Sequence, residues 1–347
     1  MLAVILIFLL FIFCSAVLLF KPKEQNGVLR SFSILIACRN EEENISSLID
    51  NLRRIDYPQE LYEVIIIDDA SGDESWKLLQ SETENSENIQ VFRIEEKSEE
   101  YKGKKAALKL AAAKAEFDYF LFTDADCRLP AGILRSYSRL LTEKTSAVIG
   151  WYMTRNCSAF QRIIDISSGV IFAVTTKLGM PFSASGMNWV LKKETFQEAG
   201  GYEKIRDKLA GDDKLLLLLV KDLGKKINFN NQCPVETILS QTENSPRLRR
   251  KYGKFSSSPL VIKVAVILMM GFYVYLPWKI IISGFEFSLI YLSGLYFLWL
   301  TVLLRFRLRF KFIDLIFLIL IPYILIYFTV RGSFGSWEWK GQRQRRD

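Results

Sequence analysis

Apolar residues gather at the two ends of this chain, and charged residues are concentrated between them. Leu2–Phe20 carries no charge and is long enough to cross a bilayer as a helix. Three more apolar stretches lie near the other end, at Pro259–Ile282, Phe285–Leu304 and Phe312–Val330. The pattern predicts membrane helices at both ends and a folded domain between them.

The first apolar run has two interpretations, an uncleaved anchor and a cleaved signal peptide. A signal peptide usually carries a basic residue before its apolar stretch, and none precedes this one. Lys21, Lys23 and Arg30 follow the run, which by the positive-inside rule places the next domain in the cytoplasm. We therefore expect an anchor at residues 1–22.

The C-terminal stretches predict about three membrane helices, whose number stays open. Four basic residues follow the second stretch and should be cytoplasmic: Arg305, Arg307, Arg309 and Lys311. The first two stretches then form an out-and-back hairpin. A third crossing would carry the basic tail outside, although Pro322 allows a kinked or re-entrant segment.

The middle of the chain alternates predicted strands with predicted helices. Apolar runs typical of buried strands occur at Phe32–Cys38, Tyr62–Asp68, Gln90–Ile94 and Tyr119–Thr123. Helical patterns occupy Arg39–Arg54 and Gly103–Ala115. This alternation predicts an α/β fold with a parallel, doubly wound sheet, in which ligands bind beyond the carboxyl ends of the strands.

Composition narrows the chemistry. The 347 residues include no histidine, so histidine-based nucleophilic catalysis and histidine zinc sites are excluded. The five cysteines form no CxxC pair, which fits reduced thiols in the cytosol better than a disulfide framework. Lys+Arg 46 against Asp+Glu 38 gives a net charge of +8. Proton transfer must therefore fall to carboxylates or to a less usual group.

Two acidic clusters follow predicted strands. Asp68, Asp69 and Asp73 lie after the second strand, and Asp124 and Asp126 after the fourth. Carboxylates one residue apart suit Mg²⁺ or Mn²⁺, which can bridge them to a diphosphate. The alternative is that these are turn and cap residues, since Ser71 or Asp73 could cap the next helix. Neither a Walker A sequence nor GxGxxG is present.

Two later segments are candidate parts of a site. Gly186-Met187-Asn188 could form a loop close to a ligand, because glycine allows unusual backbone angles. Gly211-Asp212-Asp213 precedes a predicted helix, where acidic residues often serve only as caps. In a chain without histidine, this is also the best-placed carboxylate for a general base.

Taken in order, these motifs resemble the membrane-anchored family 2 glycosyltransferases of GT-A fold, in the branch of cellulose and poly-N-acetylglucosamine synthases. The similarity covers about Phe32 to Val235. It rests on six segments in sequence order: SILIACRNEEENI, IIIDDASGD, GKKAAL, FTDADC, SGMNWVLKKETFQEAGGY and AGDDKL. The organisation it implies is an anchor at 1–22, a cytosolic transferase domain at 30–240, a basic linker at 241–258, membrane segments at 259–332 and a Trp-rich tail at 333–347.

The resemblance implies roles for individual residues. Nucleotide-sugar binding falls to Asp68, Asp69, Asp73, Lys104 and Asp124. Asp126, with Asp124 assisting, would hold Mg²⁺ or Mn²⁺. Gly186 and Asn188 belong to the acceptor loop. Asp213 would be the general base for single displacement with inversion, and Asp212 stands where the family has Glu.

One departure from the family concerns processivity. Processive members carry Gln-x-x-Arg-Trp or Gln-Arg-x-Arg-Trp before the first C-terminal membrane helix, whereas this chain has Leu248-Arg249-Arg250-Lys251-Tyr252. Arg249, Arg250 and Tyr252 could bind a diphosphate or face anionic lipid headgroups.

The predicted function is transfer from a nucleotide-sugar, expected to be a UDP-sugar, to a hydroxyl of a lipid, lipid-linked or glycan acceptor. The alternatives are a processive polysaccharide synthase, a non-catalytic membrane scaffold and a transporter component. The expected place is the cytoplasmic membrane, crossed several times, with the catalytic domain in the cytoplasm. The lipid bilayer and envelope-glycan machinery are expected partners, and nucleic acid is not.

Overall fold

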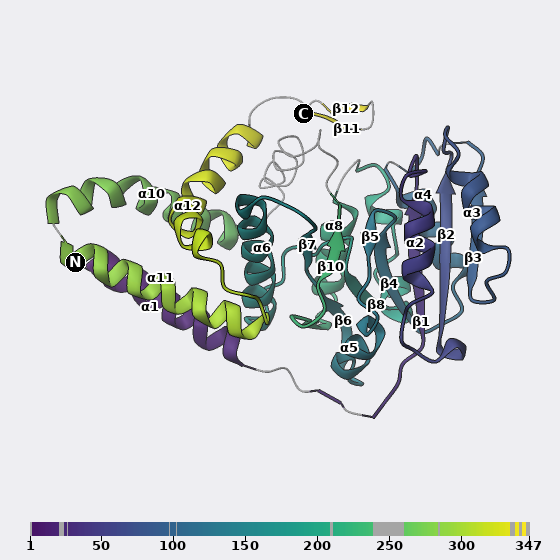
Figure 1. Cartoon of the computed structure of the whole chain (residues 1–347), viewed down its shortest axis with the longest axis horizontal. Coiled ribbons are helices and arrows are strands. Elements are labelled where there is room, and N and C mark those ends of the chain that lie inside the picture. The colour runs from purple at the N-terminus through teal and green to yellow at the C-terminus, as the bar shows by residue number, and fades with distance from the viewer. Residues whose placement is uncertain are drawn as a thin grey trace. The chain divides into compact units, whose positions relative to one another are not determined.

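The structure is a computed structural model that describes residues 2–20, 24–25, 27–96, 98–101, 103–208, 211–238, 260–283, 285–333, 337–339 and 342–344. The chain divides into two compact units (Figure 1). Unit 1 contains Met1–Phe20, Asn156–Ile166 and Leu239–Asp347, and unit 2 contains Lys21–Arg155 and Ser167–Ile238. Of the predicted transferase domain at 30–240, residues 30–155 and 167–238 lie in unit 2, and residues 156–166 and 239–240 lie in unit 1.

Unit 2 is built on a seven-stranded sheet of order β3-β2-β1-β4-β8-β6-β9. Its strands are β1 (Phe32–Cys38), β2 (Tyr62–Asp69), β3 (Ile89–Ile94), β4 (Tyr119–Asp124), β6 (Thr145–Ile149), β8 (Trp189–Lys192) and β9 (Lys226–Phe229). The first four strands are mutually parallel, which confirms the predicted doubly wound half of the sheet. The complete sheet is mixed, because β8, which the sequence did not predict, pairs antiparallel with both β4 and β6.

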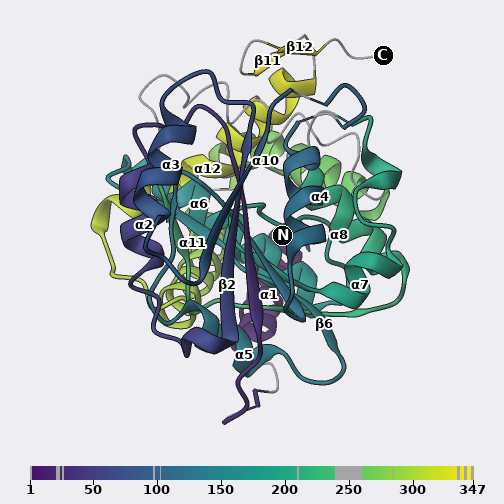
Figure 2. The same cartoon turned by 90° about the vertical axis from the view of Figure 1, so that its right-hand side faces the viewer.

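Helices cover both faces of this sheet (Figure 2). α2 (Ile45–Leu52) and α3 (Ser75–Thr83) lie on one face, and α4 (Lys105–Lys114) lies on the other. The alternation within β1 explains this arrangement, because Ile34 and Ile36 join the core cluster that contains the α2 residues, whereas Leu35 does not. The remaining helices of unit 2 include α5 (Ile133–Leu140), α7 (Lys193–Glu198) and α8 (Asp212–Asp222), with 3₁₀ turns η1 (Gln59–Leu61) and η2 (Glu203–Ile205).

The helix predicted to start at Arg39 begins only at Ile45. Its apolar stripe starts there, and Asn40 takes a left-handed conformation with φ +50° that interrupts helical geometry. Arg39 and Asn40 consequently belong to a loop directly after β1.

A second, three-stranded sheet of order β5-β10-β7 is formed by β5 (Cys127–Arg128), β7 (Tyr152–Thr154) and β10 (Val235–Thr237). It was not predicted, because strands this short leave little periodic signal. Thr237 of β10 pairs with Cys127 of β5, so this sheet holds the segment directly after Asp126.

Unit 1 contains the apolar helices α1 (Leu2–Leu19), α10 (Leu260–Ser283), α11 (Phe285–Arg305) and α12 (Phe312–Ser333). α1 lies along α11 (Figure 1), and Gly294 allows this approach because a Cβ there would stand 2.8 Å from the Phe8 ring. α6 (Ala159–Lys177) contributes its first residues to unit 1, where Arg162 forms a buried ion pair with Asp314. The tail strands β11 (Trp337–Trp339) and β12 (Gln342–Gln344) form an antiparallel hairpin.

The apolar helices were predicted correctly as helices, but the number of membrane crossings has less support. In the part of the chain that the structure describes, one helical segment, Ser288–Arg305, is long and apolar enough to cross a membrane. α1 supplies a shorter apolar segment, Ile5–Leu19. The predicted multi-pass arrangement is therefore not supported by this criterion.

The close packing at Gly150 gives a stability prediction. A Cβ at Gly150 would lie 2.4 Å from the Tyr137 hydroxyl and 2.5 Å from the Asn188 amide, both of which are buried. Gly150→Ala should lower the free energy of unfolding by about 1–3 kcal/mol through overpacking, measured by thermal unfolding with tryptophan fluorescence.

Gly132→Ala is the matched control, because nothing lies within 4 Å of its Cβ position and its φ of −86° suits alanine. Equal unfolding temperatures for the two variants would contradict the packing described around Gly150.

Candidate active site at the edge of the sheet

The site lies where β1, β2 and β4 end. β1 pairs with β2 on one side and β4 on the other, with Cys38 opposite Asp68 and Ala37 opposite Asp124. From β1 the chain proceeds to β2 and β3 on one side and then to β4 on the other side. The point between β1 and β4 is therefore the topological switch point, where open α/β sheets bind ligands. The two acidic clusters predicted from the sequence thus meet at one edge.

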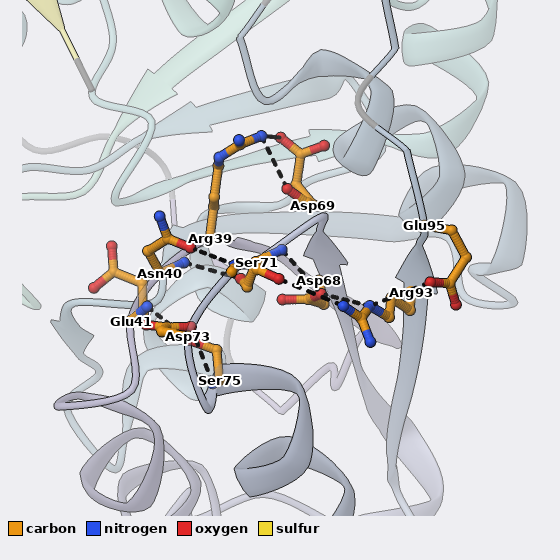
Figure 3. Close-up of polar contacts among 11 residues, drawn as sticks. Arg39, Asn40, Glu41, Asp68, Asp69, Ser71, Asp73, Ser75, Arg93 and Glu95 are labelled. Atoms are coloured by element: carbon orange, nitrogen blue, oxygen red, sulfur yellow. Dashed lines mark hydrogen bonds and ion pairs between the residues drawn. The ribbon is translucent and has the colours of Figure 1, made fainter. Parts of the chain in front are cut away.

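Asp68 is the most enclosed carboxylate of the first cluster. Its side chain is fully buried, and its Oδ2 lies 3.3 Å from Arg93 Nε and accepts a 3.3 Å hydrogen bond from the Ser71 amide (Figure 3). Its Oδ1 is buried without a hydrogen-bond partner among the described residues. Because an unsatisfied buried oxygen is costly, Asp68 is suited to accept a hydrogen bond from a ligand.

Two loops interlock beside Asp68. The Arg39 guanidinium donates to the Asp69 carbonyl at 3.1 Å and lies 3.8 Å from the Asp69 carboxylate (Figure 3). The Asn40 side-chain Oδ1 accepts a hydrogen bond from the Gly72 amide, and the backbone amide of Asn40 donates one to Ser71 Oγ. Ala70, at φ +53°, is also left-handed, so the two loops hold each other in conformations that few residues adopt.

Asp73 has a different environment from Asp68. Its carboxylate accepts hydrogen bonds from the Ser75 amide at 3.0 Å and the Glu42 amide at 3.3 Å. Desolvation works in the other direction, but these hydrogen bonds lower the pKa of Asp73. Asp73 therefore links the start of α3 to the loop after β1, but the N-cap residue of α3 is Glu74, and not Ser71 or Asp73 as the sequence suggested.

The second cluster is organised by a lysine. Lys104, directly before α4, donates a short hydrogen bond to Asp124 Oδ1, and its Nζ lies 3.7 Å from Asp212 Oδ2. Burial alone would lower the pKa of Lys104, but the charges of Asp124, Asp212 and Asp213 raise it well above its ordinary value. A single ammonium thus joins the end of β4 to the start of α8.

Asp213 belongs to the same cluster around Lys104. Its Oδ2 accepts a 2.9 Å hydrogen bond from the Gly186 amide, and its Oδ1 one of 2.8 Å from the Lys214 amide. A Cβ at Gly186 would stand 3.2 Å from Lys104 Nζ, so this position favours glycine. The structure thereby brings Lys104, Asp124, Asp212, Asp213 and Gly186 together, although they are distant in sequence.

Asp126 is hydrogen-bonded to a residue of the three-stranded sheet. Its Oδ2 accepts a 3.2 Å hydrogen bond from Thr237 Oγ1, and its Oδ1 lies 3.4 Å from Cys127 Sγ. Burial, together with the charges of Asp126 and Asp124, raises the pKa of the Cys127 thiol well above its ordinary value. This thiol is therefore kept neutral next to the carboxylates.

The donor set for a metal is small. Over the described residues, no group of three or more His, Cys, Asp or Glu side chains could hold a metal ion. Oxygen-only ligands from Asp124 and Asp126 fit Mg²⁺ or Mn²⁺, which usually retains substrate phosphate oxygens among its ligands. The residues present therefore fit a cation that is bound together with a diphosphate.

Asn188, which the sequence analysis assigned together with Gly186 to an acceptor loop, is fully buried. Its Oδ1 accepts from the Tyr137 hydroxyl at 2.6 Å, and its Nδ2 donates to the Trp151 and Cys233 carbonyls at 2.7 and 3.1 Å. The side chain thus supports the loop from inside the protein. Arg249, Arg250 and Tyr252 lie outside the described residues.

Three residues beside the acidic clusters were not among the predicted site residues: Arg39, Arg93 and Tyr202. Arg39 was assigned to a helix, although its position directly after a strand was a usable signal. Arg93 is the one charged residue in the strand β3, IQVFRI. Tyr202 is buried near the Lys104 cluster, where burial and the charge of Asp212 raise its pKa well above its ordinary value.

Comparison with known proteins was made at the levels of sequence and structure. The family model described as "Glycosyl transferase family 2" matches residues 33–198. A probable glycosyltransferase of Bacillus subtilis, YdaM, is 26% identical over 219 residues, which is 60% of this chain and 51% of that protein.

Two further relatives have more specific names. A beta-monoglucosyldiacylglycerol synthase of Trichormus variabilis is 33% identical over 127 residues, 36% of this chain and 27% of that protein. A poly-beta-1,6-N-acetyl-D-glucosamine synthase of Staphylococcus aureus is 28% identical over 192 residues, 53% of this chain and 44% of that protein. The match spans about half or less of the length of these three relatives.

A solved structure agrees with the fold. The mannosyltransferase PcManGT from Pyrobaculum calidifontis, in complex with GDP-Man and Mn²⁺, aligns with a TM-score of 0.64 at 17% identity and covers 95% of each chain. The predicted GT-A fold is therefore confirmed, in the form of a mixed central sheet.

Lys104 gives a prediction about pH. Its raised pKa means that its stabilising charge is complete below the ordinary lysine value, near 10.4, and is lost only as pH rises through the raised value. Lys104→Met should therefore lower the thermal unfolding temperature by an amount that stays constant from about pH 6 to pH 9. A difference that shrinks within that range would show that Lys104 deprotonates there.

Proposed function

Because this chain carries a family 2 glycosyltransferase domain at residues 33–198, we propose that unit 2 transfers a sugar, with inversion, from a nucleotide-sugar to an acceptor hydroxyl. The observation that carries this proposal is the cluster of Lys104, Asp124, Asp212, Asp213 and Gly186 at the edge of the sheet. In this cluster Lys104 links Asp124, which we assign to the diphosphate and its metal ion, to Asp212 beside the proposed base Asp213.

Asp213 is the general base of the proposed reaction. Its carboxylate is oriented by the Gly186 and Lys214 amides, and Lys104 favours its charged form electrostatically. It accepts the proton of the acceptor hydroxyl as the oxygen attacks the anomeric carbon, and the bond to the diphosphate breaks on the opposite face. Asp212 shares the Lys104 charge and completes the base motif.

The donor occupies the other part of the site. Asp68, through its unpartnered Oδ1, and Asp69 bind the nucleoside, with a UDP-sugar as the proposed donor. Asp124 and Asp126 would hold Mg²⁺ or Mn²⁺, which neutralises the charge of the departing diphosphate when bound. The mannosyltransferase structure, which contains GDP-Man and Mn²⁺, supports a nucleotide-sugar donor bound together with a divalent cation.

A membrane lipid is the proposed acceptor. Val170, Ile171 and Val174 in the last part of α6 and Leu178 directly after it recur at helical spacing, with Ile171 and Leu178 exposed by 40% and 38%. An exposed apolar face of this kind favours an apolar partner. The following loop leads to Gly186, and one relative is named as a synthase of a glucosylated diacylglycerol.

A processive polysaccharide synthase at the membrane is the second candidate, favoured by the similarity to the poly-beta-1,6-N-acetyl-D-glucosamine synthase. In both cases we propose that the apolar helices of unit 1 anchor the chain in the cytoplasmic membrane, with unit 2 on the cytoplasmic face. A non-catalytic scaffold has less support, because it would not need the carboxylates around Lys104.

Asp213→Asn separates a base from a helix cap. Asn caps a helix about as well as Asp, so a pure cap would leave the rate unchanged. Loss of a general base should lower the transfer rate by about 10²–10⁴-fold while donor affinity is retained. The measurements are the transfer rate and the donor affinity by calorimetry on the same purified variant.

Asp222→Asn, at the exposed opposite end of α8, is the matched control and should transfer normally. Asp126→Asn is the companion variant and should lose most Mn²⁺-dependent transfer. Wild-type transfer by Asp213→Asn would refute the proposed base.

A further inference from the structure

The segment Gly200–Lys208, called here the 200–208 segment, leads to Asp212 and Asp213. It begins with Gly200 and Gly201, both at positive φ, and contains the buried Tyr202 and the short turn η2. Its turn η2 contacts α8, which begins with Asp212 and Asp213. The contacts that fix this segment therefore influence where the two carboxylates lie.

Glu203 of this segment is tied to α4 and to the turn before it. Its Oε1 accepts a hydrogen bond from the Tyr101 hydroxyl and lies 2.7 Å from Lys109 Nζ. Lys109 also lies over the Tyr101 ring, 4.4 Å from its centre. Arg206 adds an ion pair with Glu100 in the same turn.

Lys105 provides a contact from inside the protein. Its side chain is fully buried, and its Nζ donates to the backbone carbonyl of Lys208. Burying an ammonium group lowers the stability of the fold unless hydrogen bonds compensate for the lost water, and the Lys208 carbonyl provides such a bond. Its neighbour Lys104 reaches Asp124 and Asp212, so consecutive lysines hold both the carboxylates and the segment that leads to them.

We propose that Lys105 and Glu203 are positioning residues, which fix the 200–208 segment on α4 and thereby place Asp213 for proton transfer. This inference rests on the proposed function, since it takes Asp213 as the base. The contacts that carry the proposal join Lys105 to the Lys208 carbonyl and Glu203 to Tyr101 and Lys109. They act through the backbone of the segment, whose displacement moves Asp213 relative to Gly186 and Lys104.

The effect on rate should exceed the effect on stability. Glu203 and Lys109 are each about half exposed, with side chains 50% and 49% accessible, and exposed ion pairs contribute little to folding. A misplacement of about 1 Å in a catalytic group can lower a rate by about 100-fold. A change at Glu203 should therefore leave the protein folded and the donor bound, but slow the transfer.

The test compares Glu203→Ala with Glu194→Ala. Glu194 is the matched control, because it pairs with Lys192 at 2.6 Å on the exposed surface of the same unit, outside the segment. The probe is whichever of UDP-glucose, UDP-GlcNAc and GDP-mannose the wild type uses fastest, with MnCl₂ and a bacterial lipid extract. Turnover number, donor KM and unfolding temperature are measured for each variant.

We expect Glu203→Ala to lower the turnover number by about 10–100-fold with donor KM and unfolding temperature near wild type. Glu203→Gln, which still accepts a hydrogen bond from Tyr101, should recover most of the rate. Lys105→Met should show the same separation of rate from donor KM. In combination with Asp213→Asn, Glu203→Ala should cause little additional loss, because both act on one step.

Kinetics of Glu203→Ala that equal those of Glu194→Ala would overturn the positioning role. If Asp213→Asn is inactive in the same assay, that result leaves the proposed function standing and removes only this inference. If Asp213→Asn transfers at the wild-type rate, the proposed base and the positioning role both fail.

Discussion

The ammonium of Lys104 is the interaction on which the site depends. It lies among three carboxylates that would repel one another without a cation, Asp124 at the end of β4 and Asp212 and Asp213 at the start of α8. Because Lys104 is contributed by the turn before α4, this turn couples the end of β4 to the start of α8. The Lys104 ammonium thus organises the cluster of carboxylates.

The fold explains why these carboxylates meet. β1 lies between β2 and β4, so the strands carrying Asp68 and Asp124 flank it and end at the same edge. The antiparallel β8 next to β4 then brings the preceding loop, with Gly186, to that edge. Asn188 and Gly150 secure this loop from the interior, which links a packing requirement in the core to the geometry of the base.

Much of this arrangement is encoded locally and was predictable. The runs ending at Asp68 and Asp124 are apolar strands followed by acidic turns, and both the strands and their shared edge follow from periodicity and the geometry of α/β sheets. The motif order also identified Asp213 and Lys104, which the structure brings together.

The remaining features depend on contacts between distant segments. Asn188 looks like any loop residue in sequence, but its burial depends on Tyr137, Trp151 and Cys233. The different environments of Lys104 and Lys105 follow from which side of α4 faces the carboxylates. The short β8 has no periodicity of its own, and its direction is fixed by its neighbours β4 and β6.

The central claim is that this cluster carries out sugar transfer with inversion. The most direct measurement is the anomeric configuration of the product, by proton NMR, after transfer from UDP-glucose or UDP-GlcNAc to a bacterial lipid extract with Mn²⁺. Both donors are α-linked, so single displacement assisted by Asp213 predicts a β-linked product. An α-linked product would contradict the account.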